Sequence, residues 1–343
     1  MARIFLTGGS GFIGGRLALR LVERGDEVVG LARSDAAAAI LERRGATPVR
    51  GDVLDPDSLA AGMAGCDLVF HVAGVNSHCP KDPDLLLRVN VEGPRNVVRA
   101  AAAVGIGRAV LTSSAASLGE AAGTVGTEDC AHRGSYLSVY DRSKHEGERA
   151  AFAAGRSTGV EVVAVNPSSV QGPGRKDGNG TIIIAFLNGR LRAFVRTHVS
   201  IVDIVDCVEG HLLAAERGRD GARYVLNGAT ISSEEALEIV SGLSGIYARV
   251  RMIPAPVASG AAALIEAAFR LGGRTSPICR ARVRTLLHGH RYDAALSESE
   301  LGLVYAPVAE TFRRTVVWAV ADGLVTRPLP AMARSADDEM RLR

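Results

Sequence analysis

The chain of 343 residues is long enough for one large domain or two ordinary ones. Its 40 Lys and Arg against 37 Asp and Glu give a net charge of +3, too small to predict nucleic acid as the main partner. The sequence shows neither a signal-peptide pattern nor an apolar run of membrane-spanning length, so we expect a cytoplasmic protein. His71, His78 and Cys79 lie close in sequence, but their spacing fits no metal-binding motif, so no metal site is predicted.

A glycine-rich stretch near the N-terminus follows an apolar run and precedes apolar residues at helical spacing. Residues 6–14 read Leu-Thr-Gly-Gly-Ser-Gly-Phe-Ile-Gly, which predicts a strand, a tight turn and a helix. The N-terminus of a helix binds phosphate through its N–H groups and its positive dipole end. We therefore expect a dinucleotide site that includes Gly8, Ser10, Gly11, Phe12, Ile13 and Gly14.

Strand and helix patterns alternate through the first half of the chain. Strands are predicted near residues 4–6, 27–32, 47–50, 67–72, 109–112 and 161–165. Helices are predicted near residues 36–44, 57–63, 82–103 and 137–154. Such alternation predicts an α/β fold with a Rossmann-type doubly wound parallel sheet, whose ligands bind at the carboxyl ends of the strands.

The alternation of strand and helix patterns ends after Pro167. Glycine-rich loops then interrupt short elements, and a strand is predicted at 224–226. We expect a dinucleotide-binding domain over 1–170, a smaller C-terminal substrate-binding lobe over 171–330 and a frayed tail over 331–343. An alanine-rich apolar helix is predicted at 255–271. We expect it to pack on the core or cover the site, with a membrane-surface role as the alternative.

The end of the second predicted strand bears on which dinucleotide binds. An acidic residue here accepts hydrogen bonds from the ribose of NAD, whereas Arg can pair with the 2′-phosphate of NADP. Ala32 stands where the acid is expected, and Arg33 follows it. NADP is therefore the predicted cofactor, with NAD as the alternative if Arg33 is an ordinary surface residue. Asp52, after the third strand, could accept from the adenine amino group or serve as a turn residue.

Tyr140 and Lys144 form a Tyr-x-x-x-Lys pair on one face of a predicted helix. A free Tyr has a pKa near ~10, and a neighbouring ammonium lowers that pKa by favouring the phenolate. Tyr140 could then exchange a proton with a carbonyl or alcohol, while Lys144 holds the nicotinamide ribose. Ser113 and Ser114 follow the fifth strand, where a hydroxyl could donate to the substrate oxygen.

Together these features make the chain resemble the extended short-chain dehydrogenase/reductases. The resemblance rests on the stretches at residues 7–14, 51–53, 71–74, 90–93, 112–115, 140–144, 166–174 and 210–212. It implies that Ser114 is catalytic together with Tyr140 and Lys144. It also implies that the cofactor contacts Val53, Val72, Ala73, Gly74, Thr112, Pro167 and Ser169, and that Asn90 supports the site.

Two departures favour the dihydroflavonol-reductase-like branch of that family. Nucleotide-sugar members carry Asn where this chain has Ser169, and Arg where it has Val199. We therefore expect an NADP-dependent oxidoreductase that interconverts a carbonyl and a secondary alcohol on a small, mostly apolar molecule. The pocket walls would include residues 75–79, Gln171 and Val199. The alternatives are a nucleotide-sugar epimerase or dehydratase with tightly bound NAD(P), and a non-enzymatic dinucleotide-binding protein.

The two long helices predicted at 82–103 and 137–154 suggest a symmetric homodimer, which is common in this family. Val89, Val97 and Val98 would be exposed on such a helix unless a partner covered them.

Overall fold

The computed structural model describes residues 1–331 except 275 and 277, so the tail expected from residue 332 onward lies outside the described residues. The chain forms two compact units. Unit 1 comprises Met1–Ser168, Val205–Leu226 and Tyr292–Val304, and unit 2 comprises Ser169–Ile204, Asn227–Arg291 and the chain from Tyr305 onward. This division is not the contiguous one expected from the sequence, because later segments return to unit 1 and add a strand to its sheet.

Unit 1 is built on a parallel sheet of seven strands in the order β10-β6-β5-β4-β1-β2-β3. The strands are β1 Arg3–Thr7, β2 Glu27–Ala32, β3 Thr47–Arg50, β4 Leu68–His71, β5 Arg108–Thr112, β6 Glu161–Pro167 and β10 Arg223–Leu226. The strand order reverses between β1 and β4, which is where doubly wound sheets bind dinucleotides. The predicted α/β fold class and Rossmann-type parallel sheet are confirmed.

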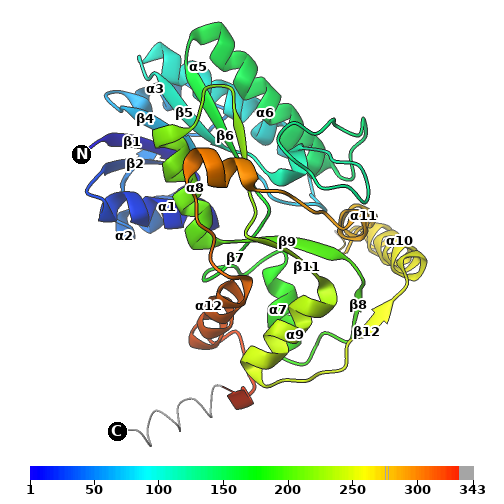
Figure 1. The fold of residues 1–343 in the computed structure, drawn as a ribbon. Coiled ribbons are helices and arrows are strands. Elements are labelled where there is room, and N and C mark those ends of the chain that lie inside the picture. Colours follow the sequence, from blue (N-terminus) through cyan, green and yellow to red (C-terminus); the bar gives the residue numbers. More distant parts are fainter. Residues whose placement is uncertain (275, 277, 332–343) are drawn as a thin grey trace, which may run out of the picture. The chain divides into compact units, whose positions relative to one another are not determined.

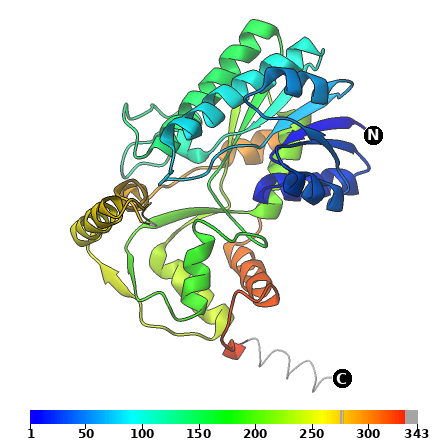
Figure 2. The same ribbon diagram turned by 180° about the vertical axis from the view of Figure 1, so that it is seen from behind.

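Helices cover both faces of this sheet (Figures 1 and 2). One face carries α3 Pro56–Met63, α5 Gly93–Ala103 and α6 Val139–Thr158, and the other carries α1 Phe12–Glu23, α2 Asp35–Arg43 and α8 Ile204–Arg217. The core under the first group includes Val89, Val97 and Val98, each at most 4% exposed. The expectation that these valines need a partner to cover them was therefore wrong, because the chain's own sheet buries them. The homodimer stays a prediction without this support.

The helix predicted at 82–103 is interrupted by a π-helical turn, Arg88–Glu92, between α4 Pro83–Leu87 and α5. Asn90 lies in this turn and is buried. A π turn inserts one extra residue per turn and is common at functional sites. A Cβ at Gly147 of α6 would collide with the carbonyl oxygen of Asn90, so glycine at 147 lets the two helices approach closely.

Glu148 fastens α6 to the sheet below it. Its carboxylate accepts hydrogen bonds from Ser117 at 3.0 Å and from Asn166 of β6 at 2.6 Å, and it pairs with Arg223 of β10 at 2.6 Å. The side chain of Glu148 is 1% exposed. A buried carboxylate of this kind is stable only while all of its partners remain.

Unit 2 contains a three-stranded sheet in the order β11-β9-β7 and a separate parallel pair, β12-β8. The strands are β7 Ser169–Gln171, β8 Ala193–Val195, β9 His198–Asp203, β11 Ala229–Ser232 and β12 Arg251–Ile253. The helices are α7 Gly180–Leu187, α9 Ser233–Ser244, α10 Ala255–Leu271, α11 Arg280–His288 and α12 Val308–Ala321. Their core is built from Ile183, Phe186, Val240, Phe312 and Val316.

The helix α10 has the predicted bounds but not the predicted burial. Ala258 and Ala262 are its only buried residues, so the expectation that it packs on the core was wrong for most of its surface. No helix in the described part of the chain is both long and apolar enough to cross a membrane.

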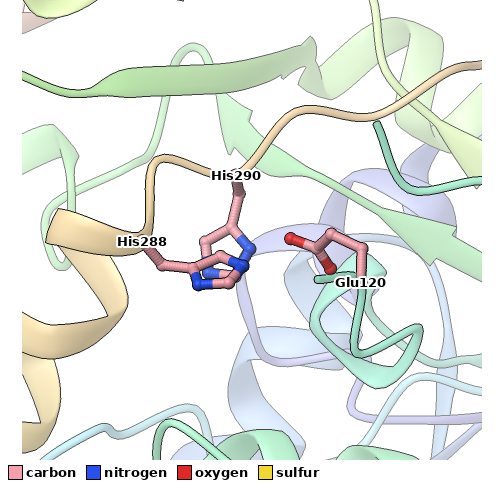
Figure 3. A group of neighbouring side chains, drawn as sticks. All are labelled: Glu120, His288 and His290. Atoms are coloured by element: carbon pink, nitrogen blue, oxygen red, sulfur yellow. The ribbon is translucent and has the colours of Figure 1, made fainter. Parts of the chain in front are cut away.

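At the end of α11 the chain turns at Gly289, whose φ is 68°, and the rings of His288 and His290 lie 4.7 Å apart (Figure 3). Glu120, also labelled in Figure 3, belongs to unit 1, where its backbone carbonyl accepts a hydrogen bond from Arg133 at 3.0 Å.

We expect Glu148→Gln to lower the free energy of unfolding by about 3 kcal/mol, because it leaves the Arg223 guanidinium without its counterion. Chemical denaturation followed by circular dichroism measures this change. Glu146→Gln is the matched control on the same helix, since it breaks only the surface pair with Arg142 at 2.8 Å and should cost at most about 0.5 kcal/mol. Equal losses for the two variants would contradict this role of Glu148.

Candidate active site

The glycine-rich turn joins β1 to α1 beside the end of β4. Gly8 has a φ of 73°, and a Cβ there would lie 2.6 Å from the backbone nitrogen of Ala73. A Cβ at Gly14 would collide with the carbonyl oxygen of Gly8, which accepts a hydrogen bond from the nitrogen of Gly11 at 2.9 Å. Only glycine at these positions lets the turn close so tightly against α1 and the neighbouring strand. Ser10, Phe12 and Ile13 complete the turn and are partly exposed.

Two buried side chains hold the segment after β4 in place. The hydroxyl of Thr7 accepts from the nitrogen of Ala73 at 3.1 Å and lies 2.8 Å from Nδ1 of His71. Burial, with a smaller contribution from Lys144, lowers the pKa of His71 to about 3, so this ring stays neutral.

Asn90 ties the same segment to α6. Its amide accepts from the nitrogen of Val75 at 2.7 Å and donates to the carbonyl of Val75 at 3.0 Å. It also donates to the hydroxyl of Ser143 at 2.9 Å, and Ser143 in turn donates to the carbonyl of Tyr140 at 2.7 Å. Asn90 thus supports the loop at 72–75 and the helix that carries Tyr140, as the family resemblance implied.

Lys144 joins α6 to the end of β5. Its Nζ donates to the carbonyl of Thr112 at 2.9 Å, while Thr112 Oγ1 lies 2.7 Å from Nε2 of the buried His211. A Cβ built on Gly74 would lie 3.6 Å from Nζ, so Lys144 also adjoins the loop after β4. Burial lowers the pKa of Lys144 from its ordinary 10.5 to about 8, although the carboxylate of Glu148 favours the charged form.

The two serines after β5 have different surroundings. Ser113 is buried and donates to Ser117 at 3.4 Å. Ser114 is partly exposed, caps the short helix Ala115–Ser117 by accepting from Ala116 at 3.2 Å, and accepts at its carbonyl from Asn166. Ser114 is therefore the serine able to meet a ligand at this strand end. Tyr140 lies in the first turn of α6, one helical turn before Lys144.

Sequence reasoning missed a polar chain beside Tyr140. The His78 ring meets the Tyr140 ring edge-on, with centroids 5.1 Å apart and planes at 68°. Nδ1 of His78 lies 3.2 Å from the hydroxyl of Ser138, which donates to the buried Asp141 at 2.9 Å. Ser138 caps α6 by accepting from the nitrogen of Asp141 at 3.1 Å. The Ser-x-x-Asp spacing before this helix is a capping signal that could have revealed Ser138.

The residues assigned to the adenosine half lie at the ends of β2 and β3. Ala32 is buried, Arg33 is exposed, and Ser34 caps α2. Asp52 uses Oδ1 to accept from the nitrogen of Leu54 at 2.9 Å, which is the turn role weighed as its alternative. The Val53 side chain is buried in the core, and its carbonyl accepts from Asn96 at 3.1 Å.

Arg44 is a second residue that the sequence did not reveal. Its Nη1 donates to the carbonyl of Gly9 at 2.5 Å and approaches that of Gly11 at 3.4 Å. A Cβ at Gly15 would collide with this guanidinium, so glycine at 15 makes room for it. The guanidinium therefore adds a positive charge beside the N-terminus of α1, where a diphosphate would bind.

Not all expected site residues belong to unit 1. Pro167 ends β6 and is buried, but Ser169, Gln171 and Val199 belong to unit 2 and are described within it. The hydroxyl of Ser169 accepts from Gln171 at 3.0 Å and from Asn179 at 2.8 Å. Val199 packs against the core of unit 2, as Ile201 does two residues along β9. The apolar side chain at 199 thus has a structural explanation that does not involve a ligand.

Comparison with known proteins now decides the family. The profile of the NAD dependent epimerase/dehydratase family matches residues 4–227. The chain belongs to this family. The "Putative dihydroflavonol 4-reductase" of Synechocystis sp. is 33% identical over 330 residues, covering 94% of this chain and 95% of that protein. "Sterol demethylase protein B" of Methylococcus capsulatus is 29% identical over 333 residues, covering 93% and 99%.

Among solved structures, the crystal structure of gox2253 is similar with a TM-score of 0.83 and 27% identity, covering 95% of this chain and 100% of that one. The expected extended short-chain dehydrogenase/reductase family is thereby confirmed, and the chain is an NAD(P)-dependent oxidoreductase of this type. The residues present fit a nicotinamide dinucleotide, because the side-chain-free turn of Gly8, Gly11 and Gly14 opens at the N-terminus of α1.

We expect Lys144 to hold the nicotinamide ribose through its ammonium group. The binding of nicotinamide dinucleotide should therefore weaken as the pH rises through about 8, because Lys144 loses its ammonium proton there. His71 and His211, whose pKa values burial lowers to about 3 and about 4, stay neutral and add no step between pH 5 and 9. Fluorescence titration of the reduced dinucleotide at a series of pH values measures the dissociation constant. Lys144→Arg should abolish the alkaline weakening, because a guanidinium keeps its charge. A step that persists in this variant would assign the titration to another group.

Proposed function

We propose that the protein is an NADP-dependent oxidoreductase that interconverts a carbonyl and a secondary alcohol on a small, mostly apolar molecule. When bound, the nicotinamide supplies or accepts the hydride. Tyr140 gives a proton to the substrate oxygen or takes one from it, and the Ser114 hydroxyl orients that oxygen. The Lys144 ammonium favours the phenolate of Tyr140 and thereby tunes its acidity.

One observation carries this proposal: the bond of Lys144 to the carbonyl of Thr112 fixes the ammonium at the carboxyl end of β5, one helical turn from Tyr140. Ser114 follows two residues after Thr112 on the same edge of the sheet. Stabilising charge on the substrate oxygen is usually the largest catalytic contribution, and these groups are held before substrate arrives. The names of the two relatives, a dihydroflavonol reductase and a sterol demethylase protein, support an apolar substrate.

The choice of NADP rests on the end of β2. Ala32 offers no acceptor for the ribose hydroxyls, and the exposed Arg33 is available to a 2′-phosphate. Arg50, paired with Ala32 across β2 and β3, is a second arginine at this edge, and its guanidinium forms an ion pair with Asp35 at 3.0 Å.

Arg33→Ala should weaken NADPH binding roughly tenfold or more and leave NADH binding nearly unchanged. A charge-assisted contact to phosphate is worth ~1.5–3 kcal/mol, and only NADPH carries that phosphate. Arg99→Ala, which removes another exposed arginine from α5, is the control and should change neither constant. Equal weakening for both dinucleotides would mean that Arg33 acts structurally.

Tyr140→Phe should lower turnover by about 10²–10⁴-fold and leave NADPH affinity within about twofold, because only the proton-transfer group is lost. Turnover is followed by NADPH absorbance with a panel of ketones and aldehydes. Tyr136→Phe is the matched control. The centroid of the Tyr136 ring lies 5.1 Å from that of His132, and Tyr136 is outside the proposed catalytic set.

The same panel includes UDP-, GDP- and dTDP-sugars with product analysis. Conversion of a nucleotide sugar without net consumption of dinucleotide would replace the proposed reaction with that of an epimerase or dehydratase. A Tyr140→Phe variant that keeps more than roughly a tenth of the turnover would remove Tyr140 from the mechanism.

A further inference from the structure

The helix α10 exposes a continuous apolar stripe along its whole length. Val257, Leu264 and Leu271 are 56%, 75% and 91% exposed, and Ala261 and Ala268 between them are exposed as well. The spacing of these five residues alternates between four and three, so they share one face of the helix. Large apolar side chains at such exposure are unusual in a row, and contiguous apolar patches mark interaction sites.

The helix is fixed to unit 2 by a different part of its surface. Ala258 and Ala262 are its buried residues, and α10 lies beside α11 in both views (Figures 1 and 2). The nitrogen of Arg280, the first residue of α11, donates to Glu266 of α10 at 2.7 Å. The helix α10 is therefore held in place through one face while the stripe on another face remains exposed.

The segment that contains the stripe is strongly basic. Residues 245–291 contain eight Arg, one Glu and no Lys or Asp, a net charge of 8 − 1 = +7. The whole chain carries +3, so the remainder carries 3 − 7 = −4. The exposed arginines of α10, of the chain after it and of α11 are Arg270, Arg274, Arg280 and Arg284, of which Arg270 pairs with Glu266 at 3.1 Å. An apolar stripe on a helix within a strongly basic segment is the chemistry of helices that lie in the interface of anionic membranes.

We propose that α10 docks the protein on the surface of an anionic lipid bilayer. The stripe from Val257 to Leu271 enters the boundary between headgroups and acyl chains, and the arginines around it contact lipid phosphates. An anionic bilayer matches both properties of this surface, because its acyl chains suit the apolar stripe and its phosphates suit the basic charge. A second copy would instead bring one +7 segment against another, and that repulsion opposes pairing through this face.

Vesicle co-sedimentation of the full chain tests this docking. The protein should pellet with vesicles of equal parts phosphatidylcholine and phosphatidylglycerol, stay in solution with phosphatidylcholine alone, and bind less as salt rises. Leu264→Ser and Leu271→Ser should each weaken binding about tenfold, because most of a buried hydrocarbon side chain is lost. Arg274→Gln should weaken it roughly fivefold.

Val304→Ser is the matched control, since Val304 is 84% exposed in unit 1 and should have no effect on binding. Circular dichroism of each variant shows whether the fold is retained. Failure to pellet with anionic vesicles would overturn the proposal, as would binding that Leu264→Ser leaves unchanged. Light scattering that shows a dimer which Leu264→Ser dissociates would assign the stripe to a second copy instead.

Discussion

The hydrogen bond from Lys144 to the carbonyl of Thr112 is the constraint on which the site depends. It places an ammonium in a largely buried position, where charge is costly, and the pKa of about 8 reflects that cost. Glu148, one turn further along α6, offsets the cost and is itself held by Ser117, Asn166 and Arg223. Through these contacts α6 is attached to β5, β6 and β10, so Tyr140 stands on a helix fixed at several points.

The buried histidines around the site have a structural role. His71 and His211 are kept neutral by burial and use their hydrogen bonds to Thr7 and Thr112 to fix strand ends. A neutral ring can both donate and accept, so it satisfies buried polar groups without a counterion. His78 differs, because it is only partly buried and its ring faces Tyr140.

Unit 2 has a packed apolar interior and, on α10, an apolar stripe that is exposed. The core around Phe186 and Phe312 accounts for the apolar residues of β9, including Val199. Packing within unit 2 does not explain the stripe on α10, and the strongly basic segment that carries it has the chemistry expected of a surface that meets anionic lipid. A membrane-docked reductase would meet an apolar substrate where that substrate concentrates, which links the proposed docking to the proposed function.

The sequence by itself determined the alternation of strands and helices up to β6 and the motifs on which the proposed chemistry depends. The bounds of β2, β3 and α10 were predicted to the residue, and Tyr140, Lys144 and the glycine-rich turn followed from spacing, because local periodicity and short motifs are properties of neighbouring residues. Only the tertiary structure decided what depends on distant residues. Arg44 reaches Gly9, and His78 reaches Ser138 and Tyr140, across separations along the chain that no local pattern encodes. Periodicity also could not predict which apolar helix faces are buried. The valines at 89, 97 and 98 and the stripe on α10 both form apolar faces of helices. The sheet of unit 1 buries these valines, whereas the stripe on α10 is exposed in the structure, because burial depends on which distant segments pack alongside a helix.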